Sequence, residues 1–489
     1  MSATAHYALL VLLMSVVGLV AVLSNRVTER LKIPAPALVF VAAALAVAWV
    51  PGVHHPDARP VEDIVTIALV FILFDGGMHI GFRRFRAAAK PIVIVGVVGT
   101  FFTTAGAAVL LAWGFGIPWY AAVLVATAVA PTDPAIVFSV LGKRQIAGRS
   151  STILEGESGA NDPVGIALMA ALLAAGGLSG HAFGSVGIEF VLQMVVGAVV
   201  GVVGARALLW FMRAVPLPSE ALYPLRTLAC VPILYGVATL AHGSGFLAVF
   251  VAGILVGDAR APYKVEIQRF HAAVASLAEI VAFVALGLTV DLGQLSRSDV
   301  LVPGLVLALV LAFVIRPVVV GLCLVPARLR RSERNFVVFA GLKGAVPILL
   351  AELLREADIP GADRWYGIVA VVVIFSVFVQ ASLTPVVAAR LKLPMRTVEP
   401  EPWSLGVRLR DEPAGVHRLT VAAGSPADGR ALDDLTLLGE RMWISFIVRD
   451  SGLVRITGET ELHVGDEVLV LADPDLKTKL TRYFERPAG

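Results

Sequence analysis

The sequence has little charge and almost no cysteine. Only 16% of its 489 residues are charged, 57% are hydrophobic, and the mean hydropathy is +0.83. A soluble globular protein carries about 25% charged residues. The two cysteines, Cys230 and Cys323, lie inside apolar runs and form neither a disulfide framework nor a metal site. These shortages exclude an ordinary soluble protein and indicate a chain that lies mostly in lipid.

Several sequence signals are also missing. No Lys or Arg precedes the first apolar stretch and no small-x-small cleavage site follows it, so we expect a retained span there and not a cleaved signal peptide. The sequence has no P-loop, no metal-ligand cluster and no Ser-His-Asp arrangement, so we expect no enzyme and no cofactor. The net charge of +3 gives no reason to expect a nucleic-acid partner.

Long apolar runs fill the first four fifths of the chain. A helix needs about 20 apolar residues to cross the hydrocarbon core. Windows of that size predict thirteen spans, near residues 7–25, 34–50, 61–80, 91–114, 118–141, 152–178, 186–212, 224–242, 244–258, 271–290, 301–325, 335–355 and 366–389. The split between the eighth and ninth spans is placed at residues 242–245.

The basic residues alternate between loops as a membrane topology requires. Loops after odd-numbered spans hold 22 Lys and Arg, and loops after even-numbered spans hold 4. Because Lys and Arg gather on the cytoplasmic side, the N-terminus is predicted outside and the C-terminus in the cytoplasm. In a bacterium, the location would be the cytoplasmic (inner) membrane.

The composition changes near residue 393. Residues 1–392 are predicted to form the membrane domain, residues 393–413 a Pro-rich, charged linker, and residues 414–489 a small cytoplasmic domain. Alternating strands, turns and a final amphipathic segment predict α/β structure for the last part. The fold class is therefore an all-α membrane protein with a small cytoplasmic α/β domain.

Two spans contain residues that a continuous helix avoids. The fifth reads "AVAPTDPAIV", with Pro131 and Pro134, and the twelfth reads "GLKGAVP", with Gly341, Gly344 and Pro347. Broken segments at matching places in two halves of a chain point to a transporter site at the midplane. The two spans are seven apart and so run in opposite directions, as an inverted repeat with two crossing broken helices requires.

Charges stand inside both breaks. At such a crossing, Asp133 would stabilise the N-terminal ends of the half-helices and Lys343 the C-terminal ends. We expect both to be fixed structural charges. Lys can lose its proton where Arg cannot, so Lys343 is less certain to be inert.

The sixth span holds the best candidates for an ion site, in "LEGESGANDPVG". Ser158 and Asp162 share one helix face, and Glu157 and Asn161 share the neighbouring stripe. Charged residues inside spans are costly and usually mark ion or proton pathways. For Glu157 the competing interpretation is a buried salt bridge, with Lys343 or Arg316 as partner. For Asp162 it is a helix-kink residue ahead of Pro163.

Other acids lie in or near the spans. Asp75, in "FILFDGGMHIGF", is either a coordinating residue or a helix-end turn residue. Glu155 is expected near the cytoplasmic headgroups. Glu189, Asp258 and Glu279 have no predicted role beyond lining an access funnel.

The stretches "GESGANDP", "APTDP", "FDGG" and "GLKGAVP" across thirteen spans resemble the monovalent cation:proton antiporter superfamily, in its NhaP-type sodium (potassium)/proton exchanger branch. This resemblance implies a homodimer and an ion- and proton-binding carboxylate at Asp162, with Asn161 beside it. It implies that Thr132, Ser158 and Asp75 help to hold an alkali cation and that Glu157 pairs with the basic residue of span twelve. The chain departs from many relatives in having Lys at 343 and Asp at 75.

Residues 414–485, with "GSPADGRALDDL" and "GDEVLVLAD", resemble the RCK-C (TrkA-C-like) domain, a ligand-sensing module of potassium transporters and channels. The resemblance implies regulation. We expect Arg430, Arg441 and His463 to meet a small anionic or nucleotide ligand.

The predicted function is electroneutral exchange of an alkali cation, potassium before sodium, for a proton. A cation channel regulated by the tail is the first alternative, although no Thr-Val-Gly-Tyr-Gly filter is present. A carrier of non-ionic solutes or a membrane-embedded enzyme is the next.

Overall fold

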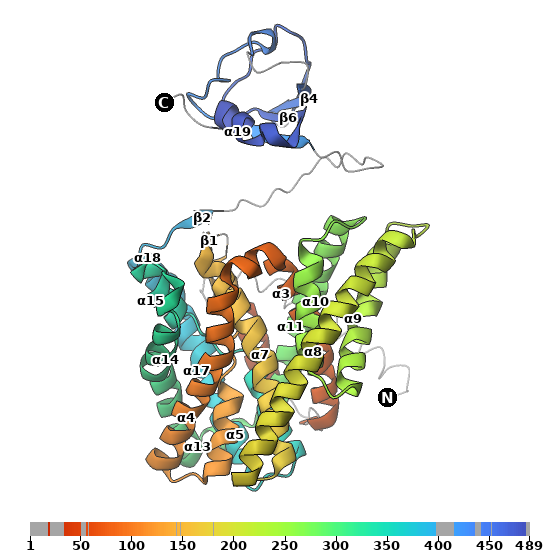
Figure 1. Ribbon diagram of the computed structural model, residues 1–489. Coiled ribbons are helices and arrows are strands. Elements are labelled where there is room, and N and C mark those ends of the chain that lie inside the picture. The colour runs from red at the N-terminus through yellow and green to blue at the C-terminus, as the bar shows by residue number, and fades with distance from the viewer. Residues whose placement is uncertain are drawn as a thin grey trace, which may run out of the picture. The chain divides into compact units, whose positions relative to one another are not determined.

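The computed structural model of the chain describes residues 18–19, 34–49, 55–56, 58–142, 144–146, 148–178, 180–397, 415–435, 442–450 and 452–485. These fall into two compact units, 1–399 and 400–489. Figure 1 shows the first as a helical body and the second as a small sheet domain. The predicted first span, 7–25, lies almost wholly outside the described residues.

Helices occupy the segments predicted as spans two to thirteen. They are α2 (Ala35–Trp49), α3 (Ala58–Val93), α4 (Thr100–Phe115), α5 (Trp119–Val129), α6 (Pro134–Leu141), α7 (Arg149–Ala175), α8 (Gly180–Ala214), α9 (Leu222–Leu240), α10 (Gly245–Gly257), α11 (Lys264–Leu288), α12 (Leu292–Leu295), α13 (Ser298–Val310), α14 (Arg316–Cys323), α15 (Arg331–Phe339), α16 (Ala345–Glu356), α17 (Ala362–Phe375) and α18 (Ala381–Arg390). Eight continuous helical segments within the described residues are long and apolar enough to cross a membrane, and α2 and α10 are shorter apolar helices. The chain is thus a mostly helical membrane-type protein, and the count of thirteen stays a prediction.

Interruptions divide several of the long segments. α3 kinks at Gly81, whose φ of 65° favours glycine. Single π-helical turns at Ile94–Gly99, Leu311–Ile315 and Ser376–Gln380 join α3 to α4, α13 to α14 and α17 to α18. Such turns are rare and often lie at functional sites.

The helices pack in two groups, which lie side by side in Figure 1. α2, the first part of α3 and α8 to α11 pack mainly on one another. α4 to α7 and α13 to α18 form the second group. One buried apolar core includes residues of both groups. A site that lies between the two groups is therefore held in position by both of them.

Two short strands connect the end of the helical body to its middle. β1 (Arg144–Ile146), between α6 and α7, pairs antiparallel with β2 (Met395–Thr397), which follows α18. Both strands belong to the first unit. The segment that leads toward the second unit is therefore hydrogen-bonded to the connection between α6 and α7.

The second unit is a four-stranded antiparallel sheet with one helix. The strand order is β3 (Val416–Thr420), β6 (Glu467–Ala472), β4 (Met442–Arg449) and β5 (Gly452–Val454). The helix α19 (Lys477–Glu485) covers one face, and its Leu480 and Phe484 are buried against Leu419, Ile447 and Val468. Alternation of buried and exposed residues along β3 matches the period of two expected for such a sheet.

An ion pair between the partly exposed Arg449 and the buried Asp466 connects the sheet of this unit to a neighbouring turn. The Arg449 guanidinium donates two hydrogen bonds of 2.8 Å to the Asp466 carboxylate, and the His463 backbone N–H donates a third. Burial acts to raise the pKa of Asp466, but these bonds and the guanidinium charge outweigh it and hold the pKa below its ordinary value of 3.8. A depressed pKa stabilises the fold above the unfolded-state pKa, and this stabilisation is lost as the pH falls through the folded-state pKa.

We therefore predict that Asp466→Asn lowers the free energy of unfolding of the fragment 414–489 by about 2–3 kcal/mol at pH 7, since it removes charge-assisted bonds to a buried group. Urea unfolding between pH 7 and pH 3 measures this, and the gap between wild type and variant should narrow below about pH 4. Glu467→Gln is the matched control, because the Arg418–Glu467 pair is about half exposed and should contribute less than about 1 kcal/mol. If Asp466→Asn and Glu467→Gln lowered the free energy of unfolding equally, the stabilising role assigned to the Arg449–Asp466 pair would be contradicted.

Candidate functional site

The break in the fifth predicted span lies between α5 and α6. α5 ends at Val129, and α6 begins at Pro134 with Asp133 as its N-cap. The Ala135 N–H donates to Asp133 Oδ1 at 2.9 Å. Pro suits the first turn of a helix, where its missing N–H is not needed, so the sequence both ends one half-helix and starts the next.

The break in the twelfth predicted span meets it. α15 ends at Phe339 and α16 begins at Ala345. The Asp133 backbone N–H donates to the Leu342 carbonyl at 2.8 Å, which joins the two breaks directly. A Cβ at 344 would overlap the Asp133 carboxylate, and one at 341 would overlap the Arg316 guanidinium. Glycine at both positions therefore permits the close crossing.

Each carbonyl end at the crossing faces a buried cation. Lys343 Nζ donates to the carbonyls of Ala130 and Pro131, at 2.9 and 3.1 Å, beyond the end of α5. The Arg316 guanidinium donates to the carbonyls of Val337 and Val338, at 3.2 and 2.8 Å, at the end of α15. Unpaired carbonyls at a helix end carry partial negative charge, which these cations neutralise.

The prediction that Glu157 pairs with Lys343 is wrong for this structure. Glu157 Oε1 lies 2.7 Å from Arg316 Nη1, and both side chains are buried. The ammonium of Lys343 is instead directed at the end of α5. Arg316 was the alternative partner considered from the sequence, and its branched guanidinium can hold the carboxylate and the α15 carbonyls together.

Two side chains that sequence reasoning missed also hold the crossing. The Lys343 backbone N–H donates to Ser376 Oγ at 2.8 Å, and Gln380 Nε2 donates to the Phe339 carbonyl at 2.7 Å. Both residues lie in the π-helical turn between α17 and α18. Polar residues inside the apolar thirteenth segment were the only signal that could have found them.

Helix α7 brings its polar face against the first break. The Asn161 side-chain amide donates to Thr132 Oγ1 at 2.8 Å and accepts from the Thr132 backbone N–H at 3.3 Å. The Ser158 hydroxyl donates to the Thr132 carbonyl in a short bond. Asn161, Ser158 and Thr132 are all buried, so this amide and the hydroxyls are fixed in place.

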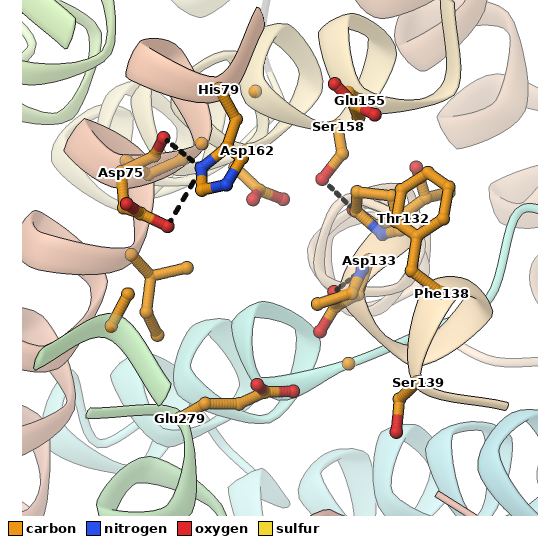
Figure 2. Close-up of a pocket in the computed structure, with 18 of the residues that line it drawn as sticks. Asp75, His79, Thr132, Asp133, Phe138, Ser139, Glu155, Ser158, Asp162 and Glu279 are labelled. Atoms are coloured by element: carbon orange, nitrogen blue, oxygen red, sulfur yellow. Dashed lines mark hydrogen bonds and ion pairs between the residues drawn. The ribbon is translucent and has the colours of Figure 1, made fainter. Parts of the chain in front are cut away.

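Asp162 lies one helical turn beyond Ser158 and faces a cavity of about 1170 Å³. Its side chain is 7% exposed, and Oδ1 has no hydrogen-bond partner among the described residues. Figure 2 shows Asp162, Ser158, Thr132 and Asp133 around the inner part of this cavity. An unsatisfied buried carboxylate is costly unless it takes a proton or a cation.

Further acids line the same cavity. Asp75 on α3 and Glu279 on α11 face it from the other group of helices, and Asp75 Oδ2 lies 3.3 Å from His79 Nδ1. Glu155 also lines the cavity and accepts from Ser151 at 2.8 Å. The structure therefore brings every predicted ion-site residue except Asn161 to the cavity wall, and Asn161 touches Thr132 behind it.

Two further acids that had no predicted role, Asp258 and Glu189, have local partners. Asp258, at the end of α10, accepts from the Arg83 N–H at 2.6 Å, and Glu189 accepts from Gln193 at 3.0 Å. No group of three or more His, Cys, Asp and Glu side chains in the described ranges could hold a transition metal. Carboxylate, hydroxyl and carbonyl oxygens around Asp162 suit a hard cation.

We predict that Glu157→Gln lowers the thermal stability of the detergent-solubilised protein, because it leaves Arg316 as an uncompensated buried charge, at a cost of about 3–5 kcal/mol. Asp162→Asn should lower it far less, since it removes an unpaired charge. A Glu157→Gln variant as stable as wild type would contradict the pairing.

Two family models match this chain. Residues 13–390 match the family described as "Sodium/hydrogen exchanger, transmembrane", and residues 416–485 match the TrkA-C domain. The K(+)/H(+) antiporter NhaP of Alkalimonas amylolytica is 33% identical over 96% of this chain and 83% of its own length. The K(+)/H(+) antiporter NhaP2 of Shewanella baltica is 32% identical over 96% of this chain and 81% of its own.

The fold has a solved counterpart. The sodium proton antiporter MjNhaP1 from Methanocaldococcus jannaschii superposes with a TM-score of 0.65, covering 76% of this chain and 99% of that chain at 24% identity. At this identity the likeness concerns the fold alone. The extent of the family match and the identity to the bacterial relatives decide the classification. The chain belongs to the sodium/hydrogen exchanger family of membrane cation/proton antiporters and carries a TrkA-C domain.

Proposed function

We propose that this antiporter exchanges one alkali cation, potassium before sodium, for one proton by competition at Asp162. The observation that carries the proposal is the Asp162 carboxylate, whose buried Oδ1 has no hydrogen-bond partner among the described residues and which lines a cavity together with Ser158 and Thr132. Potassium is favoured because relatives at 32–33% identity over most of the chain are named as K(+)/H(+) antiporters. As a family of antiporters, these proteins are transporters and not enzymes.

Competition at one carboxylate is sufficient for exchange. The ionised Asp162 holds either a proton or a partly dehydrated cation, and the empty charged form is costly to move through a low-dielectric barrier. Only the loaded site then changes its side of access. Each cation that crosses in one direction is matched by a proton in the other.

The neighbour of Asp162 limits the number of charges. Asn161 is neutral and both ends of its amide are engaged by Thr132. Positions 161 and 162 therefore hold one carboxylate, whereas two adjacent acids at these positions would hold two. We propose that the exchange is electroneutral for this reason.

The charge pattern of the loops gives this structure an orientation. The cavity is lined by Arg84, Gly148 and Arg149, which lie at the loops rich in Lys and Arg. Under the proposed topology, with the N-terminus outside, the cavity opens to the cytoplasm and the structure is the inward-facing state. We also propose a location in the inner membrane and the homodimer that the family resemblance implies.

The segment that leads to the tail is connected to the helices of the site through the pairing of β2 with β1. β2, at the start of the linker, pairs with β1, and β1 joins α6 to α7, which carry Asp133 at the N-cap and Asp162 respectively. We propose that ligand binding to the TrkA-C domain biases transport through this pairing. Arg430 and His463 are exposed on segments whose backbones bond to each other, through Leu462 N–H to the Arg430 carbonyl at 2.9 Å. They are our candidates for a small anionic or nucleotide ligand, and Arg441 lies outside the described residues.

We predict that Asp162→Asn abolishes cation-driven proton movement and its reverse in proteoliposomes, since the variant can bind neither ion competitively. A pH-sensitive dye inside vesicles with imposed K⁺ or Na⁺ gradients measures both directions. Asp299→Asn, a partly exposed acid that pairs with Arg297 and Arg364, is the control and should exchange normally. The exchange rate of the wild-type protein should not depend on the membrane potential, which is set by a method that does not use a potassium gradient. Normal exchange by Asp162→Asn would overturn the proposed mechanism, and a clear voltage dependence would overturn electroneutrality.

We predict that a chain ending at residue 392 still exchanges ions but with an altered apparent pH or cation dependence. The shift should not exceed about a hundredfold, because regulatory coupling is usually about 1–3 kcal/mol. A chain ending at residue 399 keeps β2 and serves as the matched control. If the shorter chain folds and yet has lost all exchange, the tail segment is part of the transport machinery.

A further inference from the structure

Helix α11 contributes one acid to the cavity that the proposed mechanism does not use. Glu279 lines the cavity together with Ala275, Ser276 and Phe283 from the same helix. Its Oε1 is buried and has no hydrogen-bond partner within residues that the structure describes. Figure 2 shows the carboxylate directed into the cavity, on the side that faces Asp133.

The basic groups of the cavity are engaged elsewhere. His79 contacts the Asp75 carboxylate, and Arg84 Nε donates to the Ile80 carbonyl at 3.0 Å. Arg149 donates to the carbonyls of Ala327 and Ala87. A buried structural carboxylate is normally paired or hydrogen-bonded. Glu279 therefore differs from Glu157, whose partner Arg316 is in place.

The neighbouring acid on the facing wall is also committed. Asp133 Oδ1 accepts from the Ala135 N–H, and the carboxylate fits against Gly344. Asp75, Asp162 and Glu279 are thus the carboxylates of the cavity with a buried oxygen that lacks a partner among the described residues, and of these Asp75 also contacts His79. Asp162 and Glu279 have no ion partner among those residues. They come from different groups of helices, Asp162 from α7 and Glu279 from α11.

We propose that Glu279 is a second cation-holding carboxylate, which takes the incoming alkali cation at the cavity wall and passes it to Asp162. This inference rests on the proposed function of Asp162. A cation that enters an apolar-walled cavity loses part of its hydration shell, and a carboxylate on the wall compensates for that loss. Negative charge in a low-dielectric cleft also raises the local cation concentration. Conduction through two successive weak sites lets an ion bind and still leave.

The role proposed for Glu279 does not change the number of charges that cross the membrane in each cycle. Its helix packs mainly with α2 and α3, whereas α7, which carries Asp162, is hydrogen-bonded to the first break through Ser158 and Asn161. Glu279 would hold a cation before the step that changes access, and the occupant of Asp162 decides what is carried. Loss of Glu279 should therefore weaken cation capture and leave the voltage-independence of exchange unchanged.

The test is a charge series at 279 in proteoliposomes. Glu279→Gln should raise the cation concentration for half-maximal exchange about tenfold, within the range that electrostatic focusing supplies, and leave the maximal rate within about twofold. Glu279→Asp should restore most of the affinity, and Glu279→Lys should lower it further. Ser276→Ala, one turn away on the same cavity wall, is the matched control and should leave both quantities unchanged.

The outcomes separate this inference from the proposed function. An unchanged half-maximal concentration in Glu279→Gln, with Asp162→Asn inactive, would overturn the role of Glu279 alone. A lost maximal rate with unchanged half-maximal concentration would show a positioning role and would also overturn it. If Glu279→Gln fails to fold, the double variant Ser276→Glu/Glu279→Ser moves the carboxylate along the same wall. The cation affinity of that variant should lie between the affinities of the wild-type protein and Glu279→Lys. If Glu279→Lys kept the cation affinity of the wild type, the proposal would be overturned.

Discussion

The crossing of the two broken helices is the constraint on which the rest of this antiporter depends. A chain interrupted inside a membrane leaves backbone donors and acceptors that must be satisfied by protein or water. Here the Asp133 carboxylate serves the start of α6, Lys343 serves the end of α5 and Arg316 serves the end of α15. The backbone bond from Asp133 to Leu342 fixes the two breaks to each other. Without these charges, the gaps at 130–133 and 340–344 would be among the costliest parts of the fold.

The same crossing creates the site. Because α5 stops short, the Thr132 carbonyl and hydroxyl are free of helical bonding and turn towards α7. Ser158 and Asn161 fix these groups, and Asp162 lies at the cavity with one oxygen that no described residue satisfies. The charged and amide groups at the crossing therefore hold the backbone, whereas Asp162 keeps a buried oxygen without a partner among the described residues.

Much of this could be predicted from the sequence, for identifiable reasons. Apolar runs of about 20 residues and the alternation of basic loops located the helices, and Pro131, Pro134, Gly341 and Gly344 located the breaks. The partner of Glu157 could not be predicted, because Arg316 and Lys343 both lie in apolar segments and only packing decides which one reaches it. The pairing of β1 with β2 was also missed, since three-residue strands separated by about 250 residues leave no periodic pattern.

The role proposed for Glu279 could not be predicted from the sequence either. Its position in an apolar segment was visible, but a role needs a neighbour, and the sequence does not show that α11 faces Asp133 across a cavity. Asp75 had the additional signal of the "FDGG" stretch, whereas His79, one turn later, was a signal that the sequence reasoning did not use.

We propose that the balance of charges at the crossing allows one carboxylate to control the exchange. Asp133 and Glu157 carry two negative charges when ionised, and Lys343 and Arg316 carry two positive charges, so the four groups together are neutral. Each of the four is engaged by a backbone end or by its ion partner. In the proposed cycle these four groups and Asp162 then sum to zero charge, whether Asp162 binds a proton or a monovalent cation. A crossing with an unbalanced charge would carry that charge through the membrane field on every transition, at about 2.3 kcal/mol per 100 mV. The fixed pairs therefore support the fold and at the same time free the proposed cycle from the membrane potential.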